Sequence, residues 1–305
     1  EDFMDAAFIA DQLDIPLLQE SFSREYKDRV FDYFLEELEA GRTPNPDILC
    51  NKEIKFKEFY QYAMNHDFDY IATGHYAQTD HENLFKGSDE SKDQSYFLHA
   101  IDKKVLKQTL FPLGNLKKDE VRTIARENNL ITSEKKDSTG ICFIGERPFP
   151  EFVSKYLQGE VGNIINDKEE VIGSHSGLAF YTLGQRQGLG IGGVKGASDL
   201  PWYVAKKDLT RNELTCVQGN NHPLLFSSEL STKNLFLLDE SIPKDFEGTA
   251  KVRYRQHDQK CNISIGNNSL KIVFDEPQRS VTPGQSVVIY KDNQCLGGGE
   301  ISSIN

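Results

Sequence analysis

The chain of 305 residues is long enough for two or three domains of ordinary size. Its 35 basic and 47 acidic residues give a formal charge of −12, which argues against a protein that binds nucleic acid through overall positive charge. An RNA partner would need local basic patches. The sequence has no apolar run of about 18 residues and no secretory signal, so we expect a cytoplasmic protein without a membrane partner.

Helical and strand-like segments alternate in the first part of the chain. Helices are predicted over residues 1–13, 24–39 and 54–65. The prolines of Thr43–Pro46 are expected to exclude helix, and the apolar runs Ile15–Leu18 and Asp69–Gly74 are typical of strands. This alternation predicts an α/β fold with a parallel sheet, in which ligands bind beyond the carboxyl ends of the strands.

The rest of the chain changes character twice. A helix is predicted over residues 117–126, and short strands with glycine loops over residues 150–220. Gly188, Gly190 and Gly193 satisfy G-x-G-x-x-G, but no apolar strand precedes them, so we reject a dinucleotide site. Segments that alternate or run apolar, such as Lys271–Phe274 and Ser286–Tyr290, predict a small antiparallel β-barrel. The predicted domains are 1–148, an α/β domain; 149–222, a small central domain; and 223–305, the barrel.

Five scattered cysteines include no C-x-x-C pair, which predicts reduced thiols and makes a functional cysteine reactive rather than structural. They are Cys50, Cys142, Cys216, Cys261 and Cys295. Among the seven histidines and five cysteines, His257 and Cys261 form the single i, i+4 pair and no further ligand pair accompanies it, so no bound metal is predicted.

Two of these cysteines have surroundings that suit chemistry. Cys50 follows a proline-stiffened loop that carries Asn45 and Asp47, although a buried cysteine that caps a helix is an equally good interpretation of this residue alone. Cys142 follows two lysines and has glycines on both sides, which favours an accessible thiolate. They are far apart in sequence, so only the fold could bring them together. His75, directly after a predicted strand, either reaches a ligand or simply closes that strand.

Six segments together resemble the bacterial tRNA-specific 2-thiouridylase family, in order and over essentially the whole chain. These are Gly41–Phe56, Ala72–Tyr76, Lys92–Phe97, Asp137–Gly145, Thr182–Arg186 and Arg253–Gln256. The resemblance implies an ATP-pyrophosphatase-type α/β domain, a small central domain and a C-terminal β-barrel.

The reaction that this resemblance implies is thiolation at C2 of the wobble uridine in the tRNAs for lysine, glutamate and glutamine. ATP, accompanied by Mg²⁺, adenylates the C2 oxygen, and a persulfide on Cys142 delivers sulfur. Cys50 then splits the persulfide and leaves a transient Cys50–Cys142 disulfide, with Asp47 as general acid or base. A persulfide donor is therefore an expected partner, either a relay protein or a cysteine desulfurase.

The remaining site residues are carried over from the family segments one by one. Asn45, Pro46 and Asp47 match the segment that holds the target base, and Gly74 matches an ATP contact. The residues that match tRNA contacts are His75, Lys92, Asp93, Gln94, Arg253, Tyr254 and Gln285.

In one respect the sequence departs from the family. Members begin with a strand and a Ser-Gly-Gly-Val-Asp-Ser-type loop that wraps the ATP phosphates, and no such loop occurs here. We therefore expect a catalytic domain truncated at its N-terminus that cannot adenylate uridine. Two other interpretations stay open: a non-catalytic tRNA-binding protein, and a dithiol redox protein that uses the same cysteines.

Overall fold

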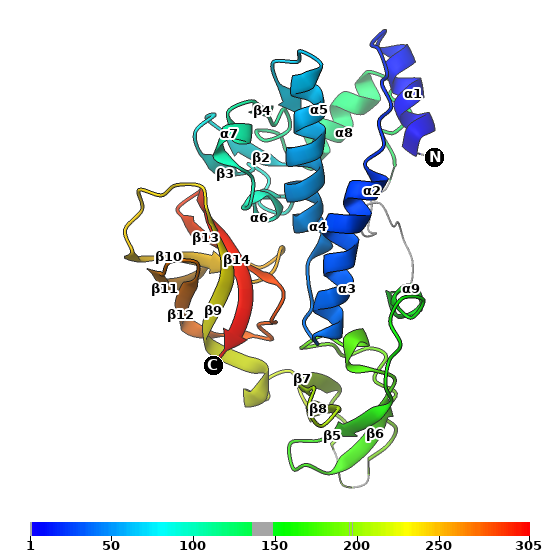
Figure 1. Cartoon of the computed structure of the whole chain (residues 1–305), viewed down its shortest axis with the longest axis vertical. Coiled ribbons are helices and arrows are strands. Elements are labelled where there is room, and N and C mark those ends of the chain that lie inside the picture. The colour runs from blue at the N-terminus through cyan, green and yellow to red at the C-terminus, as the bar shows by residue number, and fades with distance from the viewer. Residues whose placement is uncertain (1, 136–148, 195, 197) are drawn as a thin grey trace.

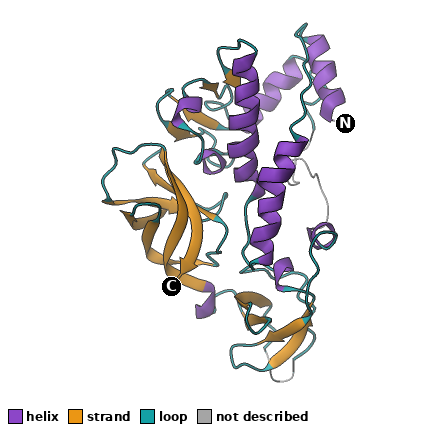
Figure 2. Ribbon diagram, viewed as in Figure 1, coloured by secondary structure: helices purple, strands orange, loops and turns teal. Residues whose placement is uncertain are grey.

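The computed structural model describes residues 2–135, 149–194, 196 and 198–305, in three regions that follow one another along the chain (Figure 1). Long helices dominate the first region, and strands dominate the other two (Figure 2). Cys142 and the rest of the segment Asp137–Gly145 lie outside the described residues.

Two long helices form the centre of the first region. Helix α1 (Asp2–Gln12) precedes both of them. The first long helix runs without interruption through α2 (Ser23–Tyr26), the π-helix η1 (Lys27–Phe31) and α3 (Asp32–Glu39). The second comprises α4 (Pro46–Leu49), the π-helix η2 (Cys50–Phe59) and α5 (Tyr60–Asn65).

Two predictions for this region are wrong. Pro46 begins a helix instead of excluding one, because a first-turn residue needs no backbone N–H donor and the fixed φ of proline suits that position. Ile15–Leu18 forms no strand, and its side chains are exposed. An apolar run becomes a strand only where another strand pairs with it, and among the described residues none lies beside this one.

A short parallel sheet and a hairpin complete the first region. Strand β1 (Ile71–Ala72) pairs in parallel with β4 (Thr109–Leu110), as the alternation of helices and strands predicted. Strands β2 (Ala77–Thr79) and β3 (Leu84–Lys86), which lie between β1 and β4 in the sequence, form an antiparallel hairpin. The other helices are α6 (Ser95–Leu98), α7 (Lys103–Leu106) and α8 (Lys118–Glu127).

The central region is a small sheet with the strand order β6-β5-β8-β7. Its elements are α9 (Phe149–Val153), β5 (Gly162–Ile165), β6 (Val171–His175), η3 (Leu178–Phe180), β7 (Trp202–Asp208) and β8 (Glu213–Gln218). Gly188 and Gly190 have positive φ in the loop between η3 and β7, so they serve as turn residues.

The last region is the predicted antiparallel barrel. After η4 (Pro223–Leu225) its strands are β9 (Phe226–Leu237), β10 (Asp245–Lys251), β11 (Gln259–Ile265), β12 (Leu270–Arg279), β13 (Ser286–Lys291) and β14 (Gln294–Ile304). The order β13-β10-β11-β12-β9-β14 closes because β13 also pairs with β14. Inward-facing Ile263, Ile272 and Ile289 are almost fully buried in its core.

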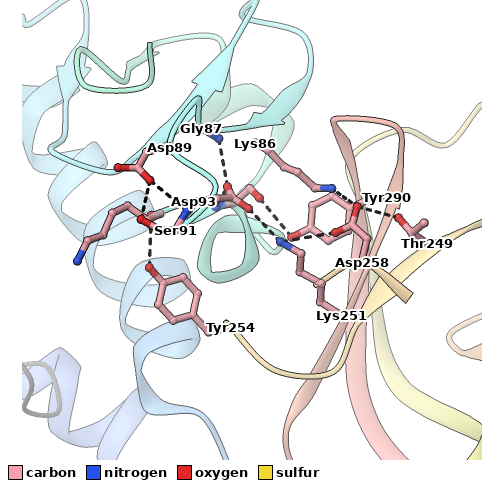
Figure 3. A network of polar contacts seen from close by, with 12 residues as sticks. Lys86, Gly87, Asp89, Ser91, Asp93, Thr249, Lys251, Tyr254, Asp258 and Tyr290 are labelled. Atoms are coloured by element: carbon pink, nitrogen blue, oxygen red, sulfur yellow. Dashed lines mark hydrogen bonds and ion pairs between the residues drawn. The ribbon is translucent and has the colours of Figure 1, made fainter. Parts of the chain in front are cut away.

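The barrel and the first region share a sheet and a core. Strand β14 pairs with β3 through Gln294–Phe85 and Cys295–Leu84, which extends the barrel sheet into the hairpin. Polar contacts reinforce this junction, where Lys251 of the barrel lies 3.3 Å from buried Asp93, and Lys86 pairs with Asp258 (Figure 3). None of the described helices is long and apolar enough to cross a membrane.

The first prediction concerns His99, buried at the end of α6, whose Nδ1 lies 2.9 Å from the carbonyl oxygen of Tyr96. Burial, together with the charge of Lys52, lowers the pKa of His99 to about 4, although the hydrogen bond to Tyr96 opposes this shift. As pH falls from about 6.5 toward 4, the unfolded chain gains a proton that the folded chain refuses, so stability is lost in this window.

We compare the free energy of unfolding in urea at pH 7 and at pH 4.5. Between these two pH values we expect it to fall by about 2 kcal/mol less in His99→Gln than in the wild type. The exposed His66→Gln variant is the matched control. An equal loss in the wild type and in His99→Gln would show that His99 is not held neutral by burial.

Candidate functional site

Residues of all three regions line one pocket of about 580 Å³. Of the residues predicted to hold a base or to contact tRNA, it brings together Asn45, Asp47, Arg253, Tyr254 and Gln285. The central region contributes Thr182–Gln185, part of a segment that carried the family resemblance. Three further lining residues were not assigned a site role from the sequence. Arg255 ends the basic run Lys251–Arg255, one of the local patches that an RNA partner would need, and Phe97 ends the segment Lys92–Phe97, whereas no sequence signal marked Thr282.

Asn45 and Asp47 are positioned by the start of a helix. The Asn45 side-chain oxygen accepts hydrogen bonds from the backbone N–H of Asp47 at 3.1 Å and of Ile48 at 3.4 Å, which makes Asn45 the N-cap. Pro46 occupies the first helical position and fixes φ there. Asp47 therefore stands in the first turn, where the helix dipole favours a negative charge.

The barrel holds the loop that leads into this helix. The Thr43 backbone N–H donates to the carbonyl oxygen of Pro283 at 2.9 Å, and Gln285 Nε2 donates to the carbonyl oxygen of Thr43 at 2.6 Å. Gly284 has a φ of +92°, and a Cβ there would lie 2.7 Å from the Thr43 nitrogen. Only glycine allows this close approach.

Arg253 and Tyr254 form the barrel side of the pocket. Arg253 Nη2 donates to the carbonyl oxygen of Ser280 at 2.8 Å, and the Tyr254 ring packs on Phe97 with centroids 4.4 Å apart. The Arg255 guanidinium lies 6.0 Å from the Tyr254 ring centroid. Aromatic faces beside arginines are the groups that stack bases and meet phosphates. The pocket can therefore take an unstacked nucleotide.

Cys50 lies outside the lining of this pocket. It is fully buried at the start of η2 and packs with Tyr26, Val30 and Ile54. This is the environment of the alternative that the sequence left open, a buried cysteine in a helix. Because Cys142 lies outside the described residues, the predicted approach of the two thiols stays a prediction.

Gly74 and His75 follow β1 at the carboxyl end of the parallel pair. Gly74 is exposed, and His75 is half-buried with Phe56 and Phe111 at centroid distances of 5.8 and 6.4 Å. Burial, and then the charge of Lys55, lowers the pKa of His75 to about 3, so the ring is neutral at physiological pH. His75 can offer a hydrogen bond but no charge to a ligand.

The segment Lys92–Gln94 is tied into the structure. Asp93 accepts hydrogen bonds from the backbone N–H of Gly87 and Ser95, in addition to its ion pair with Lys251 (Figure 3). Gln94 accepts from the backbone N–H of Tyr76 at 3.0 Å.

Lys92 and Asp93 line a second pocket of about 980 Å³, which shares Tyr254 and Arg255 with the first pocket. Asp93 and Gln94 therefore have structural partners, and the contact of this segment with tRNA stays a prediction. In the part of the chain that the structure describes, no group of three or more His, Cys, Asp or Glu side chains could hold a metal.

Comparison with known proteins defines the class to which this fold and pocket belong. Residues 1–146 match the tRNA methyl transferase HUP domain, residues 150–218 the tRNA methyl transferase PRC-barrel domain, and residues 227–301 the aminomethyltransferase beta-barrel domain. The chain therefore combines an α/β HUP domain, a central PRC-barrel domain and a C-terminal β-barrel.

Similar proteins of full length identify the family. The tRNA-specific 2-thiouridylase MnmA of Hahella chejuensis is 56% identical over 308 residues, which cover 99% of this chain and 85% of that protein. The corresponding protein of Francisella tularensis subsp. holarctica is 54% identical over 308 residues, and the aligned segment covers 99% of this chain and 86% of that protein. The chain belongs to the tRNA-specific 2-thiouridylase (MnmA/TrmU) family.

The comparisons do not support the expected truncation, since residues 1–146 match the HUP domain as a family model. That expectation used a single missing motif to judge a whole domain. The predicted inability to adenylate uridine loses its support with it.

The second prediction concerns the thiols away from the pocket. Burial raises the pKa of Cys216, Cys261 and Cys295 to about 12. Since the thiolate is the reactive form, we expect iodoacetamide to modify them on the order of a thousandfold more slowly in the native protein than in urea at the same pH. Peptide mass spectrometry gives the rates, and fast native labelling of any of the three would contradict its burial.

Proposed function

We propose that this chain is a tRNA-uridine 2-sulfurtransferase, which thiolates C2 of the wobble uridine in the tRNAs for lysine, glutamate and glutamine. The observation that carries the proposal is the pocket shared by Asn45, Asp47, Arg253, Tyr254 and Gln285. Relatives more than half identical are named tRNA-specific 2-thiouridylase, which supports the same activity. The activity belongs in the cytoplasm, where tRNA is found.

In the proposed reaction, the target uridine leaves the anticodon stack and enters the pocket. Asn45, Pro46 and Asp47 contact its base, and Tyr254 offers an aromatic face. ATP, accompanied by Mg²⁺, is a substrate: the C2 oxygen attacks the α-phosphorus, pyrophosphate leaves, and the C2 oxygen becomes part of an AMP leaving group. Gly74 is exposed at the carboxyl end of β1, where ligands of parallel sheets bind, so its position fits a nucleotide contact.

Sulfur transfer then proceeds in two displacements. The terminal sulfur of a Cys142 persulfide attacks C2, and the C2–O bond breaks as AMP departs. The Cys50 thiolate next attacks Sγ of Cys142 and breaks the S–S bond, which leaves sulfur on the base and forms a Cys50–Cys142 disulfide. A thiol reductant supplies two electrons to restore both thiols. Asp47 moves the proton at the activated base.

The burial of Cys50 constrains the second of these displacements. Its attack requires the helix α2–η1 to separate locally from η2, or the thiol to turn from Tyr26 and Val30 toward the pocket. The same burial disfavours a dithiol redox protein, whose thiols must meet disulfides in solution. A persulfide donor, either a relay protein or a cysteine desulfurase, has to reach Cys142 instead.

The third prediction tests the roles of the two cysteines. With ATP, substrate tRNA and a persulfide donor, we expect the wild type to form 2-thiouridine and Cys142→Ser to form none. Cys50→Ser should accumulate a protein–tRNA adduct joined through Cys142, which dithiothreitol releases as thiolated tRNA. Nucleoside mass spectrometry and denaturing gels measure these products.

Cys216→Ala, at a buried cysteine of the central region, is the control and should behave as the wild type. If the wild type binds tRNA but never thiolates it, the non-catalytic interpretation replaces this proposal. Full activity of Cys50→Ser without an adduct would remove Cys50 from the reaction.

The fourth prediction concerns Asp47. Asp47→Asn should lower the rate of thiolation at saturating tRNA by about 10²- to 10⁴-fold, the usual effect of a lost general acid or base, with tRNA affinity retained. Single-turnover assays and filter binding separate the two quantities. Asp67→Asn, at an exposed aspartate beyond α5, is the matched control. An unchanged rate in Asp47→Asn would rule out its role in proton transfer.

A further inference from the structure

A cluster of charged side chains joins α3 to the barrel next to the loop that carries Asn45. Arg42 Nη2 donates to Glu37 Oε1 at 2.5 Å, and Lys233 Nζ lies 3.3 Å from the same carboxylate. Lys233 also lies 2.9 Å from Glu300, which accepts a hydrogen bond of 2.5 Å from the Tyr33 hydroxyl. We call these residues, Tyr33, Glu37, Arg42, Lys233 and Glu300, the barrel clamp.

One member of the barrel clamp, Glu37, is buried, and the other four are partly exposed. Glu37 is only 4% exposed, and two carboxylates share one lysine at this junction. Burial alone would raise the pKa of Glu37, but the hydrogen bonds from Arg42 and the charge of Lys233 outweigh it and lower that pKa. Buried ion pairs add little stability compared with apolar packing, since desolvation opposes their attraction. Their clearer effect is to fix one geometry.

The fixed geometry lies at the start of the loop. The Arg42 backbone N–H donates to the carbonyl oxygen of Glu37. The next residue, Thr43, makes backbone hydrogen bonds with Pro283 and with the side chain of Gln285 in the barrel. The loop start is also tied to the central region, because Lys207 Nζ donates to the carbonyl oxygen of Gly41 at 3.1 Å.

The chain between Arg42 and Asp47 is stiff, so the position of Arg42 determines the position of Asp47. Pro44 and Pro46 fix φ at alternate positions, and Asn45 is bonded to the helix that it caps. A displacement of Arg42 would therefore move Asn45 and Asp47 together rather than be absorbed by the loop.

We propose that the barrel clamp positions Asn45 and Asp47 for catalysis, so that the barrel sets the placement of the base-holding loop in the pocket. This inference rests on the proposed function. The clamp residues lie outside the lining of the 580 Å³ pocket and act through the loop, so they are positioning residues.

The test compares Lys233→Met with Lys233→Arg in the full chain. Lys233→Met removes the cation shared by Glu37 and Glu300, whereas Lys233→Arg keeps the charge. Misplacement by about 1 Å can lower a rate on the order of a hundredfold, so we expect Lys233→Met to lose at least about tenfold in kcat at saturating tRNA. The Kd for tRNA should stay within about twofold, and Lys233→Arg should recover most of the rate.

Hydrogen exchange gives a readout independent of activity. In Lys233→Met the amides of Arg42, Thr43 and Asp47 should exchange faster, while those of β11 and β12 keep their wild-type rates. Ile263→Val, in the barrel core, is the matched control because it costs about 1 kcal/mol of stability away from the loop. It should keep both kcat and the loop protection. If Lys233→Met does not fold, Tyr33→Phe tests the same clamp by removing one hydroxyl.

The outcomes separate the two proposals. If the wild type thiolates tRNA but the clamp variants keep kcat and loop protection, the clamp inference is wrong and the function stands. A loss that lies entirely in the Kd for tRNA, or one matched by Ile263→Val, also overturns the clamp. If the wild type forms no 2-thiouridine, the proposed function fails, and hydrogen exchange still decides whether the clamp holds the loop.

Discussion

The pairing of β14 with β3 is the contact on which the rest of the structure depends. Through Gln294–Phe85 and Cys295–Leu84 it makes the barrel and the first domain parts of one sheet. Buried Tyr96, Leu98 and Tyr290 form a common core across this junction. Because the two domains are joined rigidly here, a barrel residue such as Arg253 keeps a defined place opposite Asp47, and one pocket can use both.

The chemistry of the pocket follows from its walls. Arg253 and Arg255 place positive charge in the wall of the pocket, although the chain as a whole is strongly acidic. Phe97 and Tyr254 supply the aromatic surface for a base, and Asp47 is the carboxylate among them. The neutral ring of His75 differs from these cations, since it can recognise a group only by hydrogen bonding or stacking. The local charge pattern, not the net charge, makes an RNA site possible.

Much of the fold could be predicted from local sequence pattern. Strand-type apolar runs such as Ser286–Tyr290 predicted the barrel, and the helix-strand alternation predicted the parallel pairing of β1 with β4. The failures at Ile15–Leu18 and Pro46 share a cause, because strand formation needs a partner strand and the effect of proline depends on its place in a helix.

The site was harder to predict than the fold. The motif around Asn45 and Asp47 led to the pocket, whereas the residues near Cys50 left open whether its thiol is reactive or buried, and the structure shows it fully buried. Asp93 was expected at the RNA and lies in a buried ion pair with Lys251. The Asp93–Lys251 pair joins residues 158 positions apart, and Cys50 is buried partly by Tyr26 and Val30 of another helix, so neither environment is contained in a local motif.

The proposed reaction requires that the pocket lined by Asn45 and Asp47 holds the target base. A structure of the protein bound to a substrate tRNA tests this most directly. We expect the wobble uridine to be unstacked, with its base beside Asn45 and Asp47 and within reach of Arg253 and Tyr254. A wobble uridine that stays stacked in the anticodon loop, or one bound at a different surface of the protein, would contradict the account.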